Sequence, residues 1–278
     1  MNTTKLNGQV LIEITCYLFF AVLLLYLILS GEYLSYVTPR MKPYLYFTAA
    51  VMVLWSAISA ARLFRRSYRQ RTTHCFVLVI PILLLLLPHG TVNTASLSGS
   101  TGLLTGQAAG NASPDTENRA EAVSSSAPAA PAAPLSEDGY LSTNTWGKQV
   151  ELHGYNEQAK AITVSSDEFY SWLSEISMHP SKFEGFQITM TGAVFKDPSL
   201  FAEDEFVPSR LVMSCCVADL APSGIICRYD QAAELETDAW FTVTGTLFKG
   251  EYNGLDMPKI EVSEIVPAEP VEGYLYPY

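Results

Sequence analysis

Three long apolar stretches follow one another in the first 92 residues. Residues 10–30 contain Glu13 as their only charged side chain, residues 43–64 are richer in alanine and serine, and residues 72–92 centre on a leucine-rich run. About 20 apolar helical residues cross the roughly 30 Å hydrocarbon core of a bilayer. The pattern therefore predicts a transmembrane domain over residues 1–92, a helical anchor of about three spans at 10–30, 43–64 and 72–92.

Two features of this anchor leave alternatives open. The purely apolar run 74–88 is short for a complete crossing and contains Pro81, so a buried or re-entrant helix is the alternative there. Glu13 lies near one end of the first span, and ionisable residues inside membrane helices often mark function. Its position near the interface favours the simpler interpretation, in which the carboxylate stays hydrated.

Residues 93–145 change in composition to alanine, serine, proline, threonine and glycine. Residues 127–134, for example, read APAAPAAP. Such a segment has too little apolar surface to offset the entropy lost on ordering. The composition predicts a disordered, semi-extended linker.

A helical pattern follows at residues 165–180. Ser165 and Glu168 have the spacing of a capping box at its start, and Pro180 ends it. Apolar side chains recur at positions i, i+3, i+4 and i+7, which indicates one buried face: Phe169, Trp172, Leu173 and Ile176.

Period-two patterning then predicts five short strands, at residues 186–194, 206–216, 224–229, 240–249 and 259–266. Asn253 and Gly254 supply a turn before the last strand. Gly192 and Gly245 stand inside strands, where glycine commonly marks a bend or bulge. Five short, bent strands favour an α+β domain over residues 146–278: a small barrel of the oligonucleotide/oligosaccharide-binding (OB) type with one preceding helix. An open five-stranded sheet under the helix is the alternative.

Charge divides the chain at the same place as hydropathy. Residues 1–90 hold eight Lys or Arg against two carboxylates, and the remainder holds nine against 26. Five arginines crowd the short connection between the second and third apolar stretches: Arg62, Arg65, Arg66, Arg69 and Arg71. Positive residues in short loops stay cytoplasmic. The pattern predicts a multi-pass plasma-membrane protein with a cytoplasmic N-terminus and an extracytoplasmic C-terminal domain.

This interpretation of the arginines also bears on the partners of the protein. An RNA-binding role for the cluster is the alternative, but the folded C-terminal part is strongly acidic. Because neutralising phosphates needs an excess of Lys and Arg, we expect the lipid bilayer and not nucleic acid as a partner.

The most reactive side chains lie in residues 210–227. Cys215 and Cys216 are adjacent, and a hairpin centred near residue 221 would place Cys215 opposite Cys227, where a cross-strand disulfide could form. A metal site drawing on Cys215, Cys216, Cys227 and Asp219 is the second possibility, although adjacent residues of an extended strand point to opposite faces. Cys216 shares its face with two further candidates, Arg210 and Ser214.

Plain buried thiols and a catalytic nucleophile are the remaining possibilities for these cysteines. His153 and His179 are distant in sequence from the cysteines, so no base is apparent. The sequence therefore predicts no catalytic residue, no enzyme activity and no cofactor beyond the candidate metal ion.

Several segments together resemble bacterial membrane proteins of the YcgQ type, whose members are described as permease subunits with a domain of unknown function. The similar segments are residues 36–41 (YVTPRM), His74 and Pro88 around the third apolar run, residues 210–219 (RLVMSCCVAD), Trp240, Gly245 and residues 274–277 (YLYP). The resemblance covers most of the chain. It implies a companion multi-span permease, and it carries no catalytic residues with it.

Three functions follow as hypotheses. The first is an accessory subunit of a membrane permease whose outer domain binds a solute or the partner. The second is a thiol-redox protein or envelope enzyme acting through Cys215 and Cys216. The third is an extracytoplasmic metal-handling module.

Overall fold

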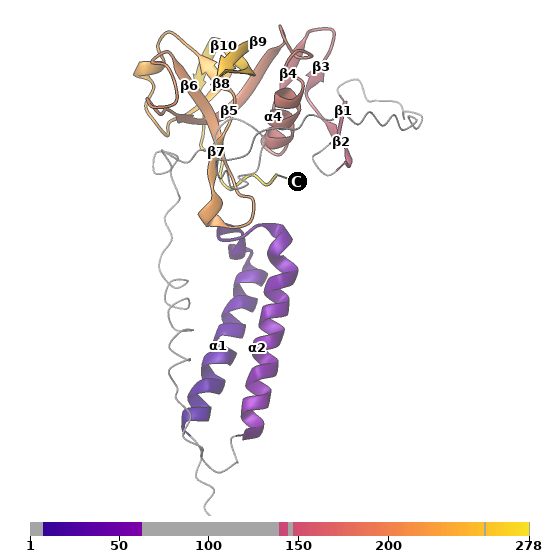
Figure 1. Ribbon diagram of the computed structural model, residues 1–278, viewed down its shortest axis with the longest axis vertical. Helices are drawn as coiled ribbons and strands as arrows, with labels where there is room; N and C mark the ends of the chain where they lie inside the picture. Colours follow the sequence, from indigo (N-terminus) through magenta and orange to yellow (C-terminus); the bar gives the residue numbers. More distant parts are fainter. Residues whose placement is uncertain (1–7, 63–138, 144–146, 253, 278) are drawn as a thin grey trace, which may run out of the picture. The chain divides into compact units, whose positions relative to one another are not determined.

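The computed structural model describes residues 8–62, 139–143, 147–252 and 254–277 (Figure 1). The chain divides into two compact units, Met1–Val92 with Cys215–Val217, and Asn93–Ser214 with Ala218–Tyr278. The predicted third span at 72–92, most of the predicted linker at 93–145 and four of the five clustered arginines lie outside the described residues.

Two apolar helices form most of the described part of the first unit. Helix α1 spans Gly8–Ser30 and α2 spans Lys42–Arg62, and the short 3-10 helices η1 (Glu32–Ser35) and η2 (Pro39–Met41) lie in their connection. Both α-helices are long and apolar enough to cross a membrane by length and composition. The first two predicted helical stretches are therefore confirmed as apolar helices.

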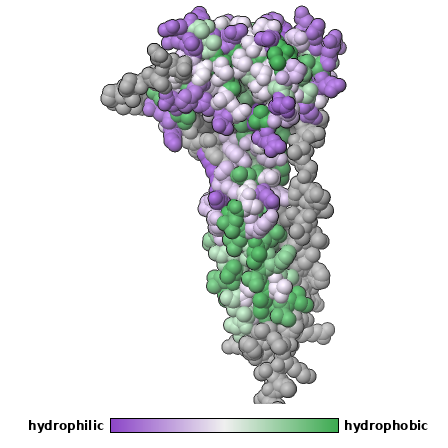
Figure 2. Space-filling model, turned by 180° about the vertical axis from the view of Figure 1, so that it is seen from behind, coloured by the Kyte–Doolittle hydropathy of each residue, from purple (hydrophilic) through white to green (hydrophobic). Residues whose placement is uncertain are grey.

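The two helices pack through small and aliphatic side chains, as the alanine and serine content of the second stretch suggested. Ala49, Ser56 and Ser59 of α2 and Ala21 of α1 are buried. The Ser59 hydroxyl donates to Glu13 Oε1 at 3.3 Å, so the carboxylate of the first helix faces the second helix. Figure 2 shows a hydrophobic surface over the helices on the face in view. Exposed large hydrophobic residues of the two helices include Leu29 and Phe47.

The second unit is built on strands that the sequence pattern largely anticipated. The five strands of its barrel are β5 (Gln187–Phe195), β6 (Glu205–Val212), β8 (Ile226–Arg228), β9 (Trp240–Tyr252) and β10 (Leu255–Pro267). They are joined in the order β5-β9-β10-β8-β6, and β6 pairs again with β5. All of these pairings are antiparallel except that of β8 with β10. The predicted five-stranded small barrel is confirmed, and the open-sheet alternative is wrong.

Two glycines allow the barrel to close tightly. A Cβ atom on Gly192 of β5 would lie 2.5 Å from the backbone of Pro208 on β6, and one on Gly245 of β9 would lie 2.4 Å from the Glu261 carbonyl oxygen on β10. The register of β10 against β9 shifts between Val262 and Glu264, beside Gly245. A bulge therefore lies where glycine predicted one.

Further short strands extend the domain beyond the five barrel strands. The strands β3 (Tyr155–Asn156) and β4 (Ala161–Thr163) continue the sheet from β5, β7 (Ala221–Ser223) pairs with β6, and β1 (Tyr140–Thr143) pairs with β2 (Gln149–Leu152). The linker prediction is therefore wrong at its C-terminal end, because Tyr140–Thr143 forms a strand whose side chains contact helix α4.

Helix α4 spans Phe169–Met178, and its predicted apolar face is buried as expected. The helix begins later than predicted, since Glu168 is its N-cap and makes no capping contact. The apolar face joins the main core with inward residues of the barrel strands, among them Val243, Leu247 and Ile260. The η5 turn (Ala232–Glu234) adds Ala232 to the same core.

Candidate functional site

The candidate site lies in the turn that follows strand β6. The pairing of β6 with β7 stops at Val212, where the strand ends. The N–H of the next residue, Met213, donates to the Leu275 carbonyl at 2.8 Å instead. The Ser214 N–H then donates to Asp219 Oδ1 at 3.0 Å. This contact closes a turn of six consecutive residues, 214–219, in which the 3-10 helix η4 (Val217–Asp219) carries the carboxylate back toward the start.

Three side chains of the types that bind metal ions meet in this turn. The Sγ atoms of Cys215 and Cys216 lie 3.7 Å apart, and these two sulfurs and a carboxylate oxygen of Asp219 lie within 4.8 Å of one another. Cys215 is exposed, and the other two are partly buried. The prediction of a strand continuing to residue 216, with its cysteines on opposite faces, is wrong because the chain has already turned.

The sulfur spacing matches the geometry of a bound metal ion. Two thiolates that bind a tetrahedral Zn²⁺ at about 2.3 Å are about 3.8 Å apart. A carboxylate oxygen supplies a third ligand of a type that zinc accepts. Three protein ligands on an accessible turn leave one coordination position open, an arrangement that favours exchange of the ion or of a bound group over a purely structural role.

Cys227 takes no part in this group. It lies on β8 opposite Phe206, so the hairpin register that predicted a Cys215–Cys227 disulfide is wrong, and neither residue forms a disulfide. The Cys227 side chain is fully buried in the main core, and burial raises the pKa of its thiol well above the ordinary value. A buried, protonated thiol is a poor metal ligand because the thiolate is the binding form.

The other two candidate residues, Ser214 and Arg210, lie on or just after β6 and make different contacts. Ser214 contributes its backbone N–H to the turn. Arg210 lies within the strand and is buried, with its guanidinium carbon 5.8 Å from the ring centroid of Phe169 and 5.6 Å from that of Trp240. Arg210 therefore packs against aromatic rings and is not part of the group formed by Cys215, Cys216 and Asp219.

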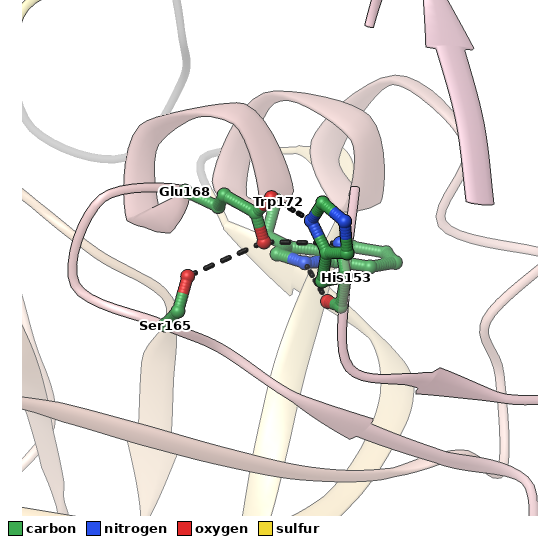
Figure 3. A network of polar contacts seen from close by, with 4 residues as sticks. All are labelled: His153, Ser165, Glu168 and Trp172. Atoms are coloured by element: carbon green, nitrogen blue, oxygen red, sulfur yellow. Dashed lines mark hydrogen bonds and ion pairs between the residues drawn. The ribbon is translucent and has the colours of Figure 1, made fainter. Parts of the chain in front are cut away.

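His153 contacts a carboxylate instead of a thiol. Glu168 accepts hydrogen bonds from the His153 N–H at 3.0 Å and the Ser165 hydroxyl at 3.2 Å, and its other oxygen lies 2.7 Å from His153 Nδ1 (Figure 3). The Trp172 indole N–H donates to the His153 carbonyl at 3.0 Å. This network, which replaces the predicted capping box, holds the chain before β3 against the start of α4.

A second polar cluster, centred on Glu175, was not predicted from the sequence. Glu175 is 3% exposed and accepts hydrogen bonds from the Tyr140 hydroxyl and the Ser142 hydroxyl, each at 2.5 Å. Lys182 Nζ donates to the same Tyr140 oxygen at 2.5 Å. Burial, and next the hydrogen bond to Glu175, raise the pKa of Tyr140. The sequence signal was the position of Glu175 three residues after Trp172, on the apolar face of the helix.

Comparison with known proteins agrees with this two-part organisation. The DUF1980 N-terminal domain matches residues 12–101 and the DUF1980 C-terminal domain matches residues 140–277. The UPF0703 protein YcgQ of Bacillus subtilis (strain 168) is 23% identical over 128 residues, which are 45% of this chain and 45% of that protein. The aligned part thus spans about half of the length of this relative. The two DUF1980 domains together match most of the length of the present chain, so this chain belongs to the DUF1980 family.

Proposed function

We propose that this protein is a membrane-anchored accessory subunit of a multi-span permease, and that its barrel domain binds a thiophilic metal ion. The single observation that carries metal binding is the convergence of Cys215, Cys216 and Asp219 within 4.8 Å. Two thiolates with one carboxylate suit Zn²⁺, and thiolates also suit Cu⁺. The open fourth position suits an ion that is passed on.

The anchor supports a place at the plasma membrane. Its two described helices are apolar and expose large hydrophobic side chains such as Leu29, Tyr44 and Phe47. The arginines after α2 favour a cytoplasmic location for that loop and an extracytoplasmic location for the barrel domain. A small helical anchor offers little room for a transport pathway of its own, which favours a larger companion.

The metal proposal is tested with purified full-length protein in detergent. Zn²⁺ is titrated in competition with a chromophoric chelator, and elemental analysis gives the stoichiometry. We expect one ion per chain. The Cys215→Ser and Cys216→Ser variants should each weaken binding by more than about 100-fold, because even loss of a group that only hydrogen-bonds to a ligand side chain costs about 10–100-fold. Asp219→Asn should weaken it less.

Cys227→Ala is the matched control, since Cys227 also lies within the C-terminal domain matched over residues 140–277 but outside the turn. It should lower stability but leave the stoichiometry and affinity unchanged. If the parent protein binds Zn²⁺ and both serine variants bind it equally well, the site is ruled out. The same holds if the parent binds no ion at micromolar free Zn²⁺. Affinity should also fall at lower pH, because the thiols must lose protons to bind.

A dithiol–disulfide couple is a second candidate function, favoured by the adjacency of the two sulfurs at 3.7 Å. Closing this pair to a bond of about 2.05 Å would release two protons and two electrons. Equilibration with glutathione buffers followed by thiol counting separates the two functions. A two-electron transition confined to Cys215 and Cys216, with no metal bound by the reduced protein, would favour the redox function.

The permease partnership is tested by mild detergent extraction and affinity purification of the tagged full-length chain. A stoichiometric multi-span membrane protein, identified by mass spectrometry, is the expected result. Recovery of the chain alone, together with transport by liposomes that contain only this chain, would contradict an accessory role.

A further inference from the structure

Arg210 occupies an unusual position for an arginine. It lies on β6 and is 4% exposed, and its guanidinium carbon lies over the rings of both Phe169 and Trp240. Contacts with aromatic rings restrict the plane of a guanidinium and leave the N–H groups at its edge for hydrogen bonds.

One of these edges lacks a partner among the described residues. Arg210 Nη1 is buried and has no hydrogen-bond acceptor. Burial lowers the pKa of Arg210, and the nearby Asp167 carboxylate raises it again, but no ion pair within 4.0 Å joins the two. Buried polar groups are nearly always paired in native proteins, so a buried charged donor without an acceptor indicates a missing acceptor.

Arg210 also lines a pocket of about 320 Å³, near the lower end of the range that holds small ligands. The remaining lining comes from the start of α4 and from the C-terminal segment: Ser166, Asp167, Val271, Glu272, Tyr274, Leu275 and Tyr276. Ser166, Asp167 and Glu272 are exposed, whereas Arg210 is buried. The pocket therefore combines a buried cationic arginine with two exposed carboxylates.

This distribution of charge selects a class of ligand. A simple anion would be attracted by Arg210 but repelled by Asp167 and Glu272 at the entrance. A molecule with a carboxylate at one end and an ammonium group at the other satisfies both, with a charge-assisted hydrogen bond from the guanidinium to the carboxylate. We propose that the pocket binds a small zwitterionic solute, an α-amino acid, with its carboxylate on Arg210 and its ammonium group beside Asp167.

The proposal concerns a surface distinct from the cysteine turn and holds whether or not that turn binds metal. It is tested by isothermal titration of metal-free full-length protein in detergent with each of the common α-amino acids. Acetate carries only the carboxylate and methylamine only the cation, so these two serve as half-ligands. We expect saturable binding of at least one amino acid, at least tenfold tighter than either half-ligand.

Two variants locate the binding. Arg210→Lys keeps the charge but loses the fork, and Asp167→Asn removes an exposed carboxylate without disturbing the core. Each should weaken amino-acid binding about 10- to 100-fold, the usual effect of losing one charged hydrogen bond. Arg228→Met is the matched control, because Arg228 also lies over an aromatic ring, Phe248, but is ion-paired with Glu261. It should bind like the parent.

Three outcomes would overturn the proposal. They are the absence of saturable binding up to about 10 mM amino acid, acetate binding as tightly as any amino acid, and unchanged affinity in both Arg210→Lys and Asp167→Asn. Thermal unfolding of each variant verifies that it is folded. Asp167→Asn keeps the test decisive if Arg210→Lys does not fold.

Discussion

Glu175 illustrates how a single residue ties the N-terminal strand to the rest of the domain. Its carboxylate is buried on α4 and accepts hydrogen bonds from Tyr140 and Ser142 of β1. Glu175→Ala should lower the free energy of unfolding by about 2 kcal/mol, because it leaves buried hydroxyl groups without an acceptor. Chemical denaturation of the full-length protein measures the change.

The exposed Glu157 provides the comparison for this prediction. Glu157→Ala should change the free energy of unfolding by less than about 0.5 kcal/mol, as is usual for surface substitutions. Equal effects of the two substitutions would show that the Glu175 cluster does not hold β1 to the helix.

His153 makes the stability of the domain depend on pH. The hydrogen bond and the charge of Glu168 raise the pKa of this histidine in the folded protein. A raised histidine pKa stabilises the fold fully below the unfolded value of about 6.5, and this contribution is lost as the pH rises through the higher folded value. The stability difference between parent and His153→Gln should therefore be largest in mildly acid buffer and shrink at alkaline pH.

Unfolding midpoints of both proteins between pH 5 and pH 9 test this dependence. Glu168→Gln should remove the same pH-dependent part, because the partner charge is gone. A stability difference that grows with pH, or that survives unchanged in the Glu168→Gln background, would contradict the assignment.

Among the elements, β5 and β9 depend on glycines where the barrel closes. Gly192→Ala would place a methyl group 2.5 Å from the backbone of Pro208, which has no flexible side chain to move away. Overpacking of this kind costs about 1–3 kcal/mol, and we expect the upper end of that range because both strands must separate. Thermal or denaturant unfolding measures the loss.

Gly250→Ala is the matched control, since the new methyl group would meet only the side-chain carbons of Lys259, the nearest at 2.7 Å. A side chain can shift where a backbone cannot, so the cost should be smaller than that of Gly192→Ala, although the ion pair of Lys259 with Glu205 must adjust. If the two alanine variants were equally stable, close strand approach at Gly192 would not govern barrel closure.

The sequence predicted those elements whose pattern is local. All five barrel strands and the buried face of α4 follow from alternation or helical spacing. Strand β1 was missed because its residues come directly after the alanine- and proline-rich segment, and only tertiary contacts to Glu175 define it. The start of α4 was misplaced because Glu168 bonds to His153, a partner 15 residues away.

The candidate site was predictable in its residues but not in its geometry. Cys215, Cys216 and Asp219 stand out by chemistry, yet their convergence depends on β6 ending at Val212. That end is set by the pairing of Met213 with Leu275, more than 60 residues later in the chain. For the same reason no sequence pattern excluded Cys227, whose burial follows from the closed barrel.

At the scale of the whole molecule, an apolar helical unit and an acidic barrel domain belong to one chain. The positive loop after α2 predicts that the barrel domain lies outside the cytoplasm. A metal-binding turn there would meet ions before or after they cross the membrane, which is where an accessory subunit of a permease would act. The central claim is therefore that the turn with Cys215 and Cys216 lies outside the cytoplasm and binds a metal ion there.

Labelling of Cys215 and Cys216 with a membrane-impermeant maleimide on intact spheroplasts tests this claim most directly. The protein would carry Cys16→Ser, Cys75→Ser and Cys227→Ala, so that only the turn can react. The account predicts labelling without lysis, and protection from labelling by micromolar Zn²⁺. Labelling that requires lysis would place the barrel domain in the cytoplasm, and labelling that Zn²⁺ leaves unchanged would contradict metal binding by the turn.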